Sequence, residues 1–349
     1  MIGFLPHNRY NEWDEFVENH KYGTIYHSTS WMNILRKNFN VQEMILCEYS
    51  NDSIICGMPF LLHNNILRGK RLISITSAQA CNPLVNSQDQ LNRLKIFLTK
   101  YIKKEKIKFV QIRTDESFNF QFDGFYTVNT DFFTYILDLN APYEEIRNKY
   151  HRSCILKPLN KLNSDQFKLV NSCDEKLLKE FYYNYETMRK EHGLLPQPYS
   201  FFKGITENLS AKNQVDIFHL IHNNKVISSV INLKFKEKYT YEYGATNKEF
   251  KSLHPSHFLI DYSIRTAINS GYKIFDFGRT DSSNTGLENF KRRWGGKKSV
   301  FKYYHIWADE IVNSTGLHSK SFHLINAIIS HTPERIYRLV GPVIYKKAF

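Results

Sequence analysis

The chain has 349 residues, which is more than one hydrophobic core usually fills, so its length predicts two domains. Hydrophobic residues make up 42% of the sequence and aromatic residues 15%, a composition that excludes a disordered chain. Lys and Arg outnumber Asp and Glu by 47 to 34, and the resulting formal charge of +13 attracts anions. Because these cations are scattered along the chain, we expect no DNA-binding module and no DNA partner.

The cysteines and the hydropathy pattern indicate the cellular compartment in which the protein works. The five cysteines are odd in number and lack a Cys-x-x-Cys spacing, which argues against a disulfide framework or a zinc knuckle. Residues 1–13 lack the basic start and apolar centre of a secretion signal, and no run of about 18 apolar residues could cross a bilayer. We therefore expect a cytoplasmic protein in a reducing environment.

The first half of the chain alternates strand-like and helical patterns. Strands are predicted over 41–49, 53–62, 71–77, 107–112 and 132–139. The first two flank a polar turn at 50–52, and a helix with an apolar face is predicted over 88–104. We expect the strand at 132–139 to close this first unit.

The second half repeats the same order of elements. After a short basic helical segment at 142–158, where we place the domain boundary, a helix over 174–191 is predicted to begin with the capping box Ser172-x-x-Glu175. Strands are predicted over 215–222, 226–235, 239–243, 273–277 and 300–307, with a helix over 255–270. The triplet Arg113-Thr114-Asp115 also recurs as Arg279-Thr280-Asp281 at the corresponding position, which indicates an internal duplication.

The segment that follows the strand at 273–277 has the character of a site. The strand ends in Gly278, a polar loop follows, and Thr285-x-x-Glu288 is predicted to cap the next helix. In that helix Leu287, Phe290 and Trp294 share one apolar stripe, with Lys291 at its border. The pattern is equally consistent with an ordinary amphipathic helix that carries three solvated cations.

The chain resembles the FemAB-type transferases, a family built from two tandem acyltransferase domains of the GNAT fold. The resemblance lies in His27-Ser28-Thr29-Ser30-Trp31, the basic segment 146–152, Tyr243-Gly244-Ala245-Thr246, Phe275-Asp276-Phe277-Gly278, Gly286-Leu287, Phe290-Lys291 and Trp294-Gly295. It implies an α/β (α+β) fold class with two GNAT-like domains, each with a mixed, mainly antiparallel sheet flanked by helices. We predict an N-terminal domain at 1–145, a C-terminal domain with the site at 146–310, and a helical tail at 311–349.

The resemblance implies an N-acyltransferase. Its donor is either aminoacyl-tRNA or acyl-CoA, and both stay open because the coiled-coil insertion that some relatives carry for tRNA is missing. No tightly bound cofactor is expected. The acceptor is an amine of a peptidoglycan or polysaccharide precursor of the cell envelope, lipid-linked or nucleotide-linked. The alternative, suggested by the +13 charge, is a non-catalytic RNA-binding or anionic-lipid-binding protein on the same scaffold.

Three residues are the catalytic candidates. Lys291 resembles the family's lysine, which is implied to face a phosphate or the reacting carbonyl; the alternative is a solvated surface lysine. Asp276 lies in an apolar strand and is either a satisfied structural acceptor or a site carboxylate. Glu242 is placed by strand alternation opposite Tyr241 and Tyr243, as a candidate general base or a plain surface glutamate.

The remaining candidates bind substrate or donor. Arg279 and Asp281 follow a strand end, where open α/β sheets place ligands, although loop polarity alone would also explain them. Tyr243 and Arg292 are assigned to substrate binding with them. Ser256 and His257, at a helix start, are assigned to the donor phosphates, with an ordinary helix start as the alternative.

Two further expectations concern metals and membranes. The pair His254-x-x-His257 lacks a third ligand at a recognisable spacing, so we predict no metal site. No nucleotide-binding glycine motif occurs, and an activated donor must therefore supply the energy. The tail at 321–349 mixes apolar and basic residues, which suits either a docked C-terminal helix or peripheral contact with a membrane.

Overall fold

The computed structural model describes residues 1–65, 69–128, 130–161, 166–308 and 328–348. The chain forms two compact units. Unit 1 comprises Met1–Phe133 and the segment that begins at Ser299, and unit 2 comprises Thr134–Lys298 and the segment that ends at Ala348. The domain limits at 145/146 and 310/311 stay predictions.

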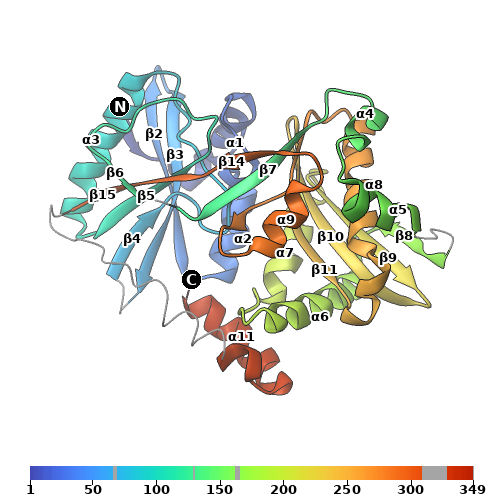
Figure 1. Cartoon of the computed structure of the whole chain (residues 1–349). Helices are drawn as coiled ribbons and strands as arrows, with labels where there is room; N and C mark the ends of the chain where they lie inside the picture. Colours follow the sequence, from blue (N-terminus) through green and yellow to red (C-terminus); the bar gives the residue numbers. More distant parts are fainter. Residues whose placement is uncertain (66–68, 129, 162–165, 309–327, 349) are drawn as a thin grey trace. The chain divides into compact units, whose positions relative to one another are not determined.

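Unit 1 contains a seven-stranded sheet in the order β1-β2-β3-β4-β5-β15-β6 (Figure 1). Its strands are β1 (Ile2–Phe4), β2 (Val41–Ser50), β3 (Ser53–Asn65), β4 (Gly69–Ile73), β5 (Phe109–Thr114), β6 (Tyr126–Val128) and β15 (Lys302–Trp307). Its helices are the 3₁₀ turns His7–Arg9 and Ile25–His27, α1 (Tyr10–Asn19), α2 (Thr29–Asn38) and α3 (Gln88–Lys104). Only β4 and β5 pair in parallel among these described strands, as expected where a helix connects two strands.

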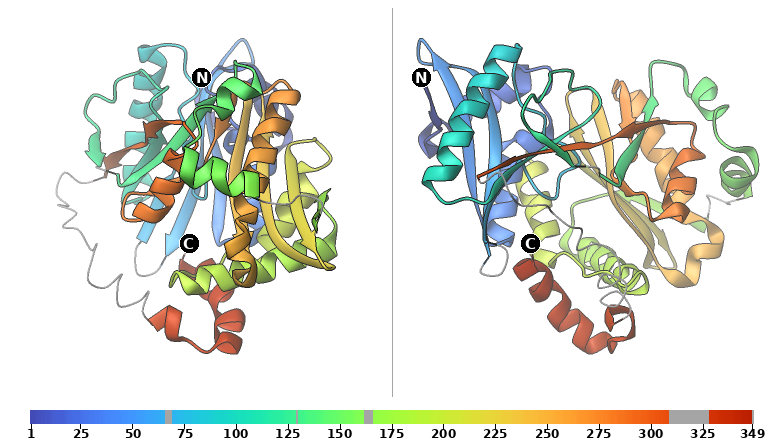
Figure 2. Two further views of the ribbon diagram at one scale, coloured as in Figure 1. Left: turned by 45° about the vertical axis from the view of Figure 1, so that its right-hand side comes forward. Right: turned by 60° about the vertical axis from the view of Figure 1, so that its left-hand side comes forward.

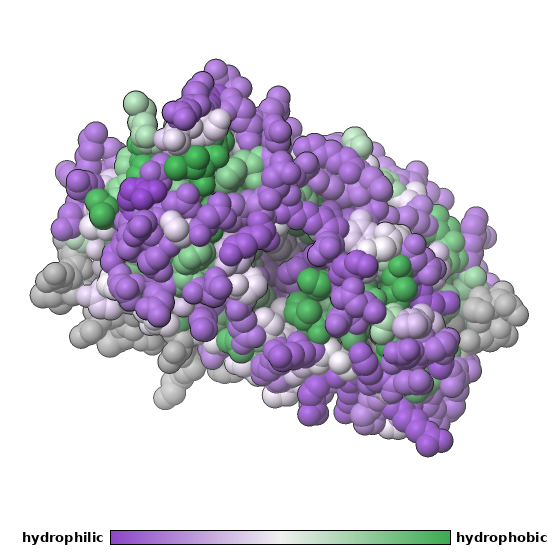
Figure 3. All heavy atoms as spheres, turned by 90° about the horizontal axis from the view of Figure 1, so that it is seen from above, coloured by the Kyte–Doolittle hydropathy of each residue, from purple (hydrophilic) through white to green (hydrophobic). Residues whose placement is uncertain are grey.

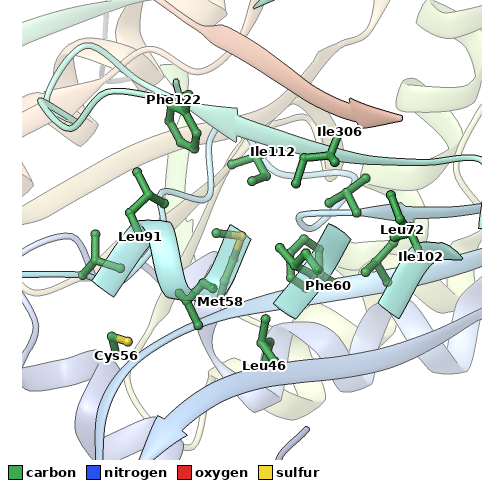
Figure 4. Close-up of a cluster of buried hydrophobic side chains, with 14 of the residues drawn as sticks. Leu46, Cys56, Met58, Phe60, Leu72, Leu91, Ile102, Ile112, Phe122 and Ile306 are labelled. Atoms are coloured by element: carbon green, nitrogen blue, oxygen red, sulfur yellow. The ribbon is translucent and has the colours of Figure 1, made fainter. Parts of the chain in front are cut away.

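The core of unit 1 lies between this sheet and α3 (Figure 4). Ser87 caps α3 by accepting a hydrogen bond from the Gln90 N–H, and the helix buries Leu91, Leu94, Leu98 and Ile102 at helical spacing. The sheet supplies residues such as Leu46, Phe60, Leu72 and Ile112 from its strands. The predicted helix at 88–104 is therefore confirmed, because its apolar face has a sheet to cover.

Unit 2 contains a second sheet in the order β13-β7-β12-β11-β10-β9-β8, with β14 also paired to β7. Its strands are β7 (Phe132–Asp138), β8 (Lys168–Asn171), β9 (Val215–His222), β10 (Lys225–Phe235), β11 (Lys238–Thr246), β12 (Ile274–Asp276), β13 (Thr280–Asp281) and β14 (Lys297–Val300). Its helices are α4 (Tyr143–Arg147), the π-helix Arg152–Leu156, α5 (Lys157–Lys161), α6 (Glu175–Glu191), α7 (Tyr199–Leu209), the 3₁₀ turn Lys248–Leu253, α8 (Pro255–Asn269), α9 (Thr285–Arg292) and α11 (Glu334–Ala348).

Helices cover both faces of the second sheet. Tyr243 of β11 packs its ring against Phe202 of α7, with a centroid distance of 5.1 Å. On the other face the Asn232 amide of β10 donates to the Ser263 hydroxyl of α8. The fold class predicted from the sequence, two mixed sheets flanked by helices, is thus confirmed.

The last strand of each half pairs with the sheet of the other half. We expected 132–139 to close the first unit, but β7 pairs with β12, with Asp276 opposite Ile136. We expected 300–307 in the second unit, but β15 pairs with β5 and β6, and Ile306 joins the core of unit 1 (Figure 4). These two predictions were wrong because local sequence patterns define a strand without defining its partner.

Local features of the two halves support the internal duplication. Both leading hairpins turn through two residues with positive φ, Asn51 and Asp52 in one and Asn223 and Asn224 in the other, as type I′ turns require. The repeated triplet also folds alike: the Asp115 carboxylate accepts from the Ser117 N–H at 3.0 Å, and the Asp281 carboxylate accepts from the Ser283 N–H at 2.9 Å.

Both predicted capping boxes were wrong. Asp174, not Ser172, caps α6 and accepts from the Lys176 and Leu177 N–H groups. Asn284, not Thr285, caps α9 and accepts from the Leu287 N–H. Asp and Asn side chains cap helices as well as Ser or Thr does, so a neighbouring residue took each position.

Other segments also differ from their predictions. The single helix expected at 142–158 is broken into α4, the π-helix and α5, and α7 was not predicted. Of the tail predicted at 311–349, residues 311–327 and 349 lie outside the described chain, while α11 is helical. None of the helices in the described part of the chain is both long enough and apolar enough to cross a membrane. The face seen in Figure 3 is mainly hydrophilic, with hydrophobic residues in separate patches.

Candidate active site

The candidate site lies in unit 2, where two parallel strands part. β11 and β12 pair from Lys238 and Ile274 to Thr240 and Asp276, after which β12 ends while β11 continues to Thr246. The chain turns at Gly278, which has a φ of +75°, a conformation that glycine adopts without strain. Most of the site residues predicted from the sequence lie at the end of β12, in and just after this turn, in the half of β11 that extends beyond β12, and in the following helix α9.

Asp276 shapes this turn from within. Its side chain is 2% exposed, and one carboxylate oxygen accepts from the Thr134 hydroxyl at 2.6 Å and from the Gly278 N–H at 2.9 Å. The other oxygen lies 3.4 Å from the Lys238 ammonium. Asp276 is therefore a satisfied structural acceptor, one of the two readings that the sequence left open.

Lys291 points inward from α9 and is 3% exposed. Its Nζ donates to the Gly278 carbonyl at 2.8 Å and to the Arg279 carbonyl at 3.2 Å. The net effect on the Lys291 ammonium is a pKa lowered to about 7. Burial is the main cause, and the nearby carboxylates of Asp276 and Glu242 offset only part of it. The alternative of a solvated surface lysine is therefore wrong.

Glu242 is half-buried in the part of β11 that lies beyond β12. The register of β11 with β10 skips this residue: Tyr241 faces Asn232 and Tyr243 faces Ile231, so Glu242 is the extra residue of a β-bulge. Its charge acts on the Lys291 ammonium and raises the pKa of that group. The site thus holds a carboxylate and a buried amine that interact through space.

The bulge also changes which way the neighbouring tyrosines point. A Cβ on Gly244 would collide with the Tyr241 hydroxyl, so Tyr241 lies on the face opposite to Tyr243. Regular alternation had predicted the two tyrosines on one face, with Glu242 on the other; this was wrong because the bulge interrupts the alternation. Tyr243 is surrounded by aromatic rings of α6 and α7, and burial raises the pKa of its hydroxyl well above the ordinary value.

The predicted substrate residues lie around this centre with different exposures. The side chains of Arg279 and Arg292 are exposed, and Arg279 lowers the pKa of Lys291 through its charge. Arg292 donates to the Asn289 side chain at 3.0 Å. Asp281 accepts from the Ser283 hydroxyl at 2.6 Å and so closes its own turn.

Ser256 and His257 lie in the first turn of α8. The preceding Pro255 has no N–H, and the His257 N–H already donates to the His254 carbonyl at 3.0 Å. The His257 ring packs against Phe290 and Trp294, residues of α9 and the turn after it, and burial lowers its pKa to about 4. His257 is thus a neutral packing partner of the α9 segment.

Two residues that contact the site were not found from the sequence. Thr134 donates to Asp276, yet it comes from β7, the strand that was assigned to the first half. Lys238 pairs with the same carboxylate from the start of β11. No sequence signal marked either residue, because both contacts depend on strand pairing. Among the described residues, no group of three or more His, Cys, Asp or Glu side chains could hold a metal ion.

Comparison with known proteins places this site within a matched domain. Residues 151–292 match the acetyltransferase (GNAT) domain family. Over 164 residues the chain is 24% identical to the lipid II:glycine glycyltransferase of Staphylococcus haemolyticus (strain JCSC1435), a match that covers 45% of this chain. The chain spans only 31% of the length of that relative.

Solved structures share the fold over most of the chain. FemX has a TM-score of 0.68 at 16% identity, with 87% of this chain and 96% of FemX covered. A tandem GNAT protein from the clavulanic acid biosynthesis pathway has a TM-score of 0.54 at 9% identity, with 89% of this chain and 100% of that chain covered. The C-terminal domain of a putative lysylphosphatidylglycerol synthetase from Agrobacterium fabrum has a TM-score of 0.55 at 10% identity, with coverages of 87% and 92%.

Proposed function

We propose that this chain, a FemAB-type protein built on tandem GNAT-fold domains, transfers an aminoacyl group from an activated ester to an amine of a peptidoglycan precursor. The observation that carries the proposal is Lys291, a buried ammonium held at the point where β11 and β12 part. The similarity to the glycyltransferase from Staphylococcus haemolyticus and the fold shared with FemX support the proposal.

The reaction needs little more than positioning and charge stabilisation. The neutral amine of the acceptor bonds to the ester carbonyl carbon, the ester C–O bond breaks, and the amine proton ends on the leaving oxygen. An oxyanion forms on the way, and a fixed cationic donor beside it lowers the barrier. No covalent enzyme intermediate is required.

Lys291 is suited to this task by its hydrogen bonds. An ammonium has three N–H donors, and two of them go to the carbonyls of Gly278 and Arg279. The third N–H is left for the oxyanion or for the leaving oxygen. With a pKa of about 7, the group also gains and loses its proton near neutrality.

The neighbouring residues complete the proposed site. We assign Glu242 as the base that keeps the acceptor amine neutral, because its half-buried carboxylate lies on the same open half of β11. Asp276 holds the turn that supplies the two carbonyls to Lys291. Arg279 and Arg292 are exposed cations for anionic parts of either substrate, and Tyr243 and Asp281 remain proposed substrate contacts.

For the donor we favour aminoacyl-tRNA over acyl-CoA. The start of α8, where Ser256 and His257 were assigned to phosphate, offers few free amides, because Pro255 has none and the His257 N–H is used within the turn. The formal charge of +13 suits a polyanionic donor. The named activity of the relative, glycyl transfer to lipid II, suggests a lipid-linked acceptor.

A transfer assay tests the proposal. Purified protein is incubated with labelled glycyl-tRNA, a panel of other charged tRNAs, or acetyl-CoA, and with lipid-linked or nucleotide-linked peptidoglycan precursors. We expect aminoacyl transfer from a charged tRNA, reduced roughly 10²-fold or more by Lys291→Met. The control Lys298→Met, at an exposed lysine six residues past α9, should leave the transfer rate unchanged. Turnover of acetyl-CoA alone, RNA retention without transfer, or full activity of Lys291→Met would contradict it.

A further inference from the structure

Helix α11 carries a stripe of exposed apolar side chains. On a helical projection at about 100° per residue, the five members fall within one arc of roughly 140°. They are Ile336 (51% exposed), Leu339 (75%), Val340 (42%), Val343 (52%) and Ile344 (46%). Single exposed apolar residues are ordinary on protein surfaces, but a continuous stripe on one helix marks an interaction face.

The opposite side of α11 contacts unit 2, and several of these contacts are polar. The Tyr337 hydroxyl donates to the Leu194 carbonyl at 2.7 Å, and Arg338 forms an ion pair of 3.1 Å with the buried Glu186 of α6. The Arg338 guanidinium also lies 4.0 Å from the centroid of the Tyr183 ring. Figure 2 shows α11 beside α6. These contacts hold the helix with its apolar stripe facing outward.

The charges on α11 are almost all positive. Arg335, Lys346 and Lys347 are exposed. On the projection Arg335 and Lys346 both border one edge of the apolar stripe, and Lys347 falls within it near the end of the helix. The one acidic residue of the helix, Glu334, is engaged by Arg338 at 2.7 Å. The outward face of α11 thus combines apolar and cationic side chains.

We propose that α11 binds the surface of an anionic phospholipid membrane, lying in the headgroup region with its apolar stripe toward the acyl chains. Helices that bind in this way have an apolar face bordered by Lys and Arg, and no membrane-spanning length is needed. Each cation near an anionic surface strengthens partitioning by roughly fivefold. This inference stands on α11 alone and does not depend on the proposed transfer reaction.

A second copy of the chain fits this face less well. In an isologous contact between two α11 helices, Arg335, Lys346 and Lys347 of both copies would be brought together without acidic partners. Five side chains on a 15-residue helix also provide much less area than the ~800 Å² per partner of a stable interface. An anionic lipid surface satisfies both the charge and the apolar stripe.

Vesicle binding of the full chain tests the inference. Sedimentation is measured with phosphatidylcholine vesicles and with vesicles that contain about 30% phosphatidylglycerol. We expect binding to the anionic vesicles that weakens with salt, and a loss of roughly tenfold or more in the variant L339Q/V343Q. The control Ile96→Gln, at a residue of α3 that is 55% exposed, is expected to bind like the wild type.

Two further measurements separate the outcomes. In the variant Leu339→Trp, insertion is expected to shift the tryptophan emission to shorter wavelength on anionic vesicles only. Circular dichroism checks that L339Q/V343Q remains folded. The inference is overturned if L339Q/V343Q binds vesicles as well as the wild type, or if the wild type ignores anionic vesicles and instead forms a concentration-dependent dimer that this variant abolishes.

Discussion

The stability of the protein is expected to depend on pH through Lys291. In the folded chain its pKa is about 7, against an ordinary value of 10.5, because the ammonium is buried. Between these two values the unfolded chain holds a proton that the folded chain has lost. The free energy of unfolding therefore rises with pH across this window, and below pH 7 the folded state bears the full cost of a buried charge.

The size of this effect follows from the two pKa values. Between pH 6 and pH 9 the difference in proton binding integrates to about 3 kcal/mol of added stability. The variant Lys291→Met retains an unbranched side chain of similar volume, one heavy atom shorter, and removes the titrating group. Relative to this variant, the free energy of unfolding of the wild type should rise by about 3 kcal/mol from pH 6 to pH 9.

Guanidinium unfolding followed by circular dichroism measures this difference. The free energy of unfolding is determined for wild type, Lys291→Met and the control Lys298→Met at pH 6, 7, 8 and 9. The control removes an exposed ammonium, 44% accessible, so it should follow the wild-type pH profile. Parallel profiles for wild type and Lys291→Met would refute the reasoning, because the ammonium would then not be desolvated in the folded chain.

Two substitutions test the turn and the loop around the site by thermal denaturation. Asp276→Ala leaves the Thr134 hydroxyl and a backbone N–H without their buried acceptor, so we expect a loss of roughly 2–4 kcal/mol; an unchanged melting temperature would contradict the assigned role. Gly295→Ala places a Cβ 2.6 Å from the Lys149 Cβ at a φ of +81°, so the free energy of unfolding should fall by about 2 kcal/mol or more. In the control Gly286→Ala the new Cβ meets nothing closer than 3.8 Å, so this variant should be as stable as the wild type or more stable.

Local patterns predicted much of the fold. The helix at 88–104 was predicted with its observed bounds because an apolar stripe and polar ends are both local signals. The hairpin turn at 50–52 was predicted from its local polar residues, and the positive φ values at Asn51 and Asp52 suit those residue types. Helix α7 was missed although it buries Phe201, Phe202 and other apolar residues.

The site was predicted less completely, because its geometry depends on contacts between distant segments. Lys291 was singled out from its motif, but its burial results from the turn at Gly278, which Asp276 closes. The direction of Tyr241 depends on a bulge that no local pattern reveals. Thr134 could be connected to Asp276 only by knowing that β7 pairs with β12.

Because β7 pairs with the second sheet and β15 with the first, we make a last prediction about fragments of the chain. A fragment of residues 1–145 keeps β7 without its partner β12 and loses β15. β5 then keeps only β4 as a neighbour, β6 loses its pairing with β15, and the core of unit 1 loses Ile306. Exposed, unpaired strand edges promote aggregation. We therefore expect this fragment to aggregate or to unfold without cooperativity, whereas co-expression with 146–349 should restore a stable complex. A monomeric fragment 1–145 with a sharp thermal transition would show that unit 1 folds without β15 and would contradict the pairing of the last strand with the first sheet.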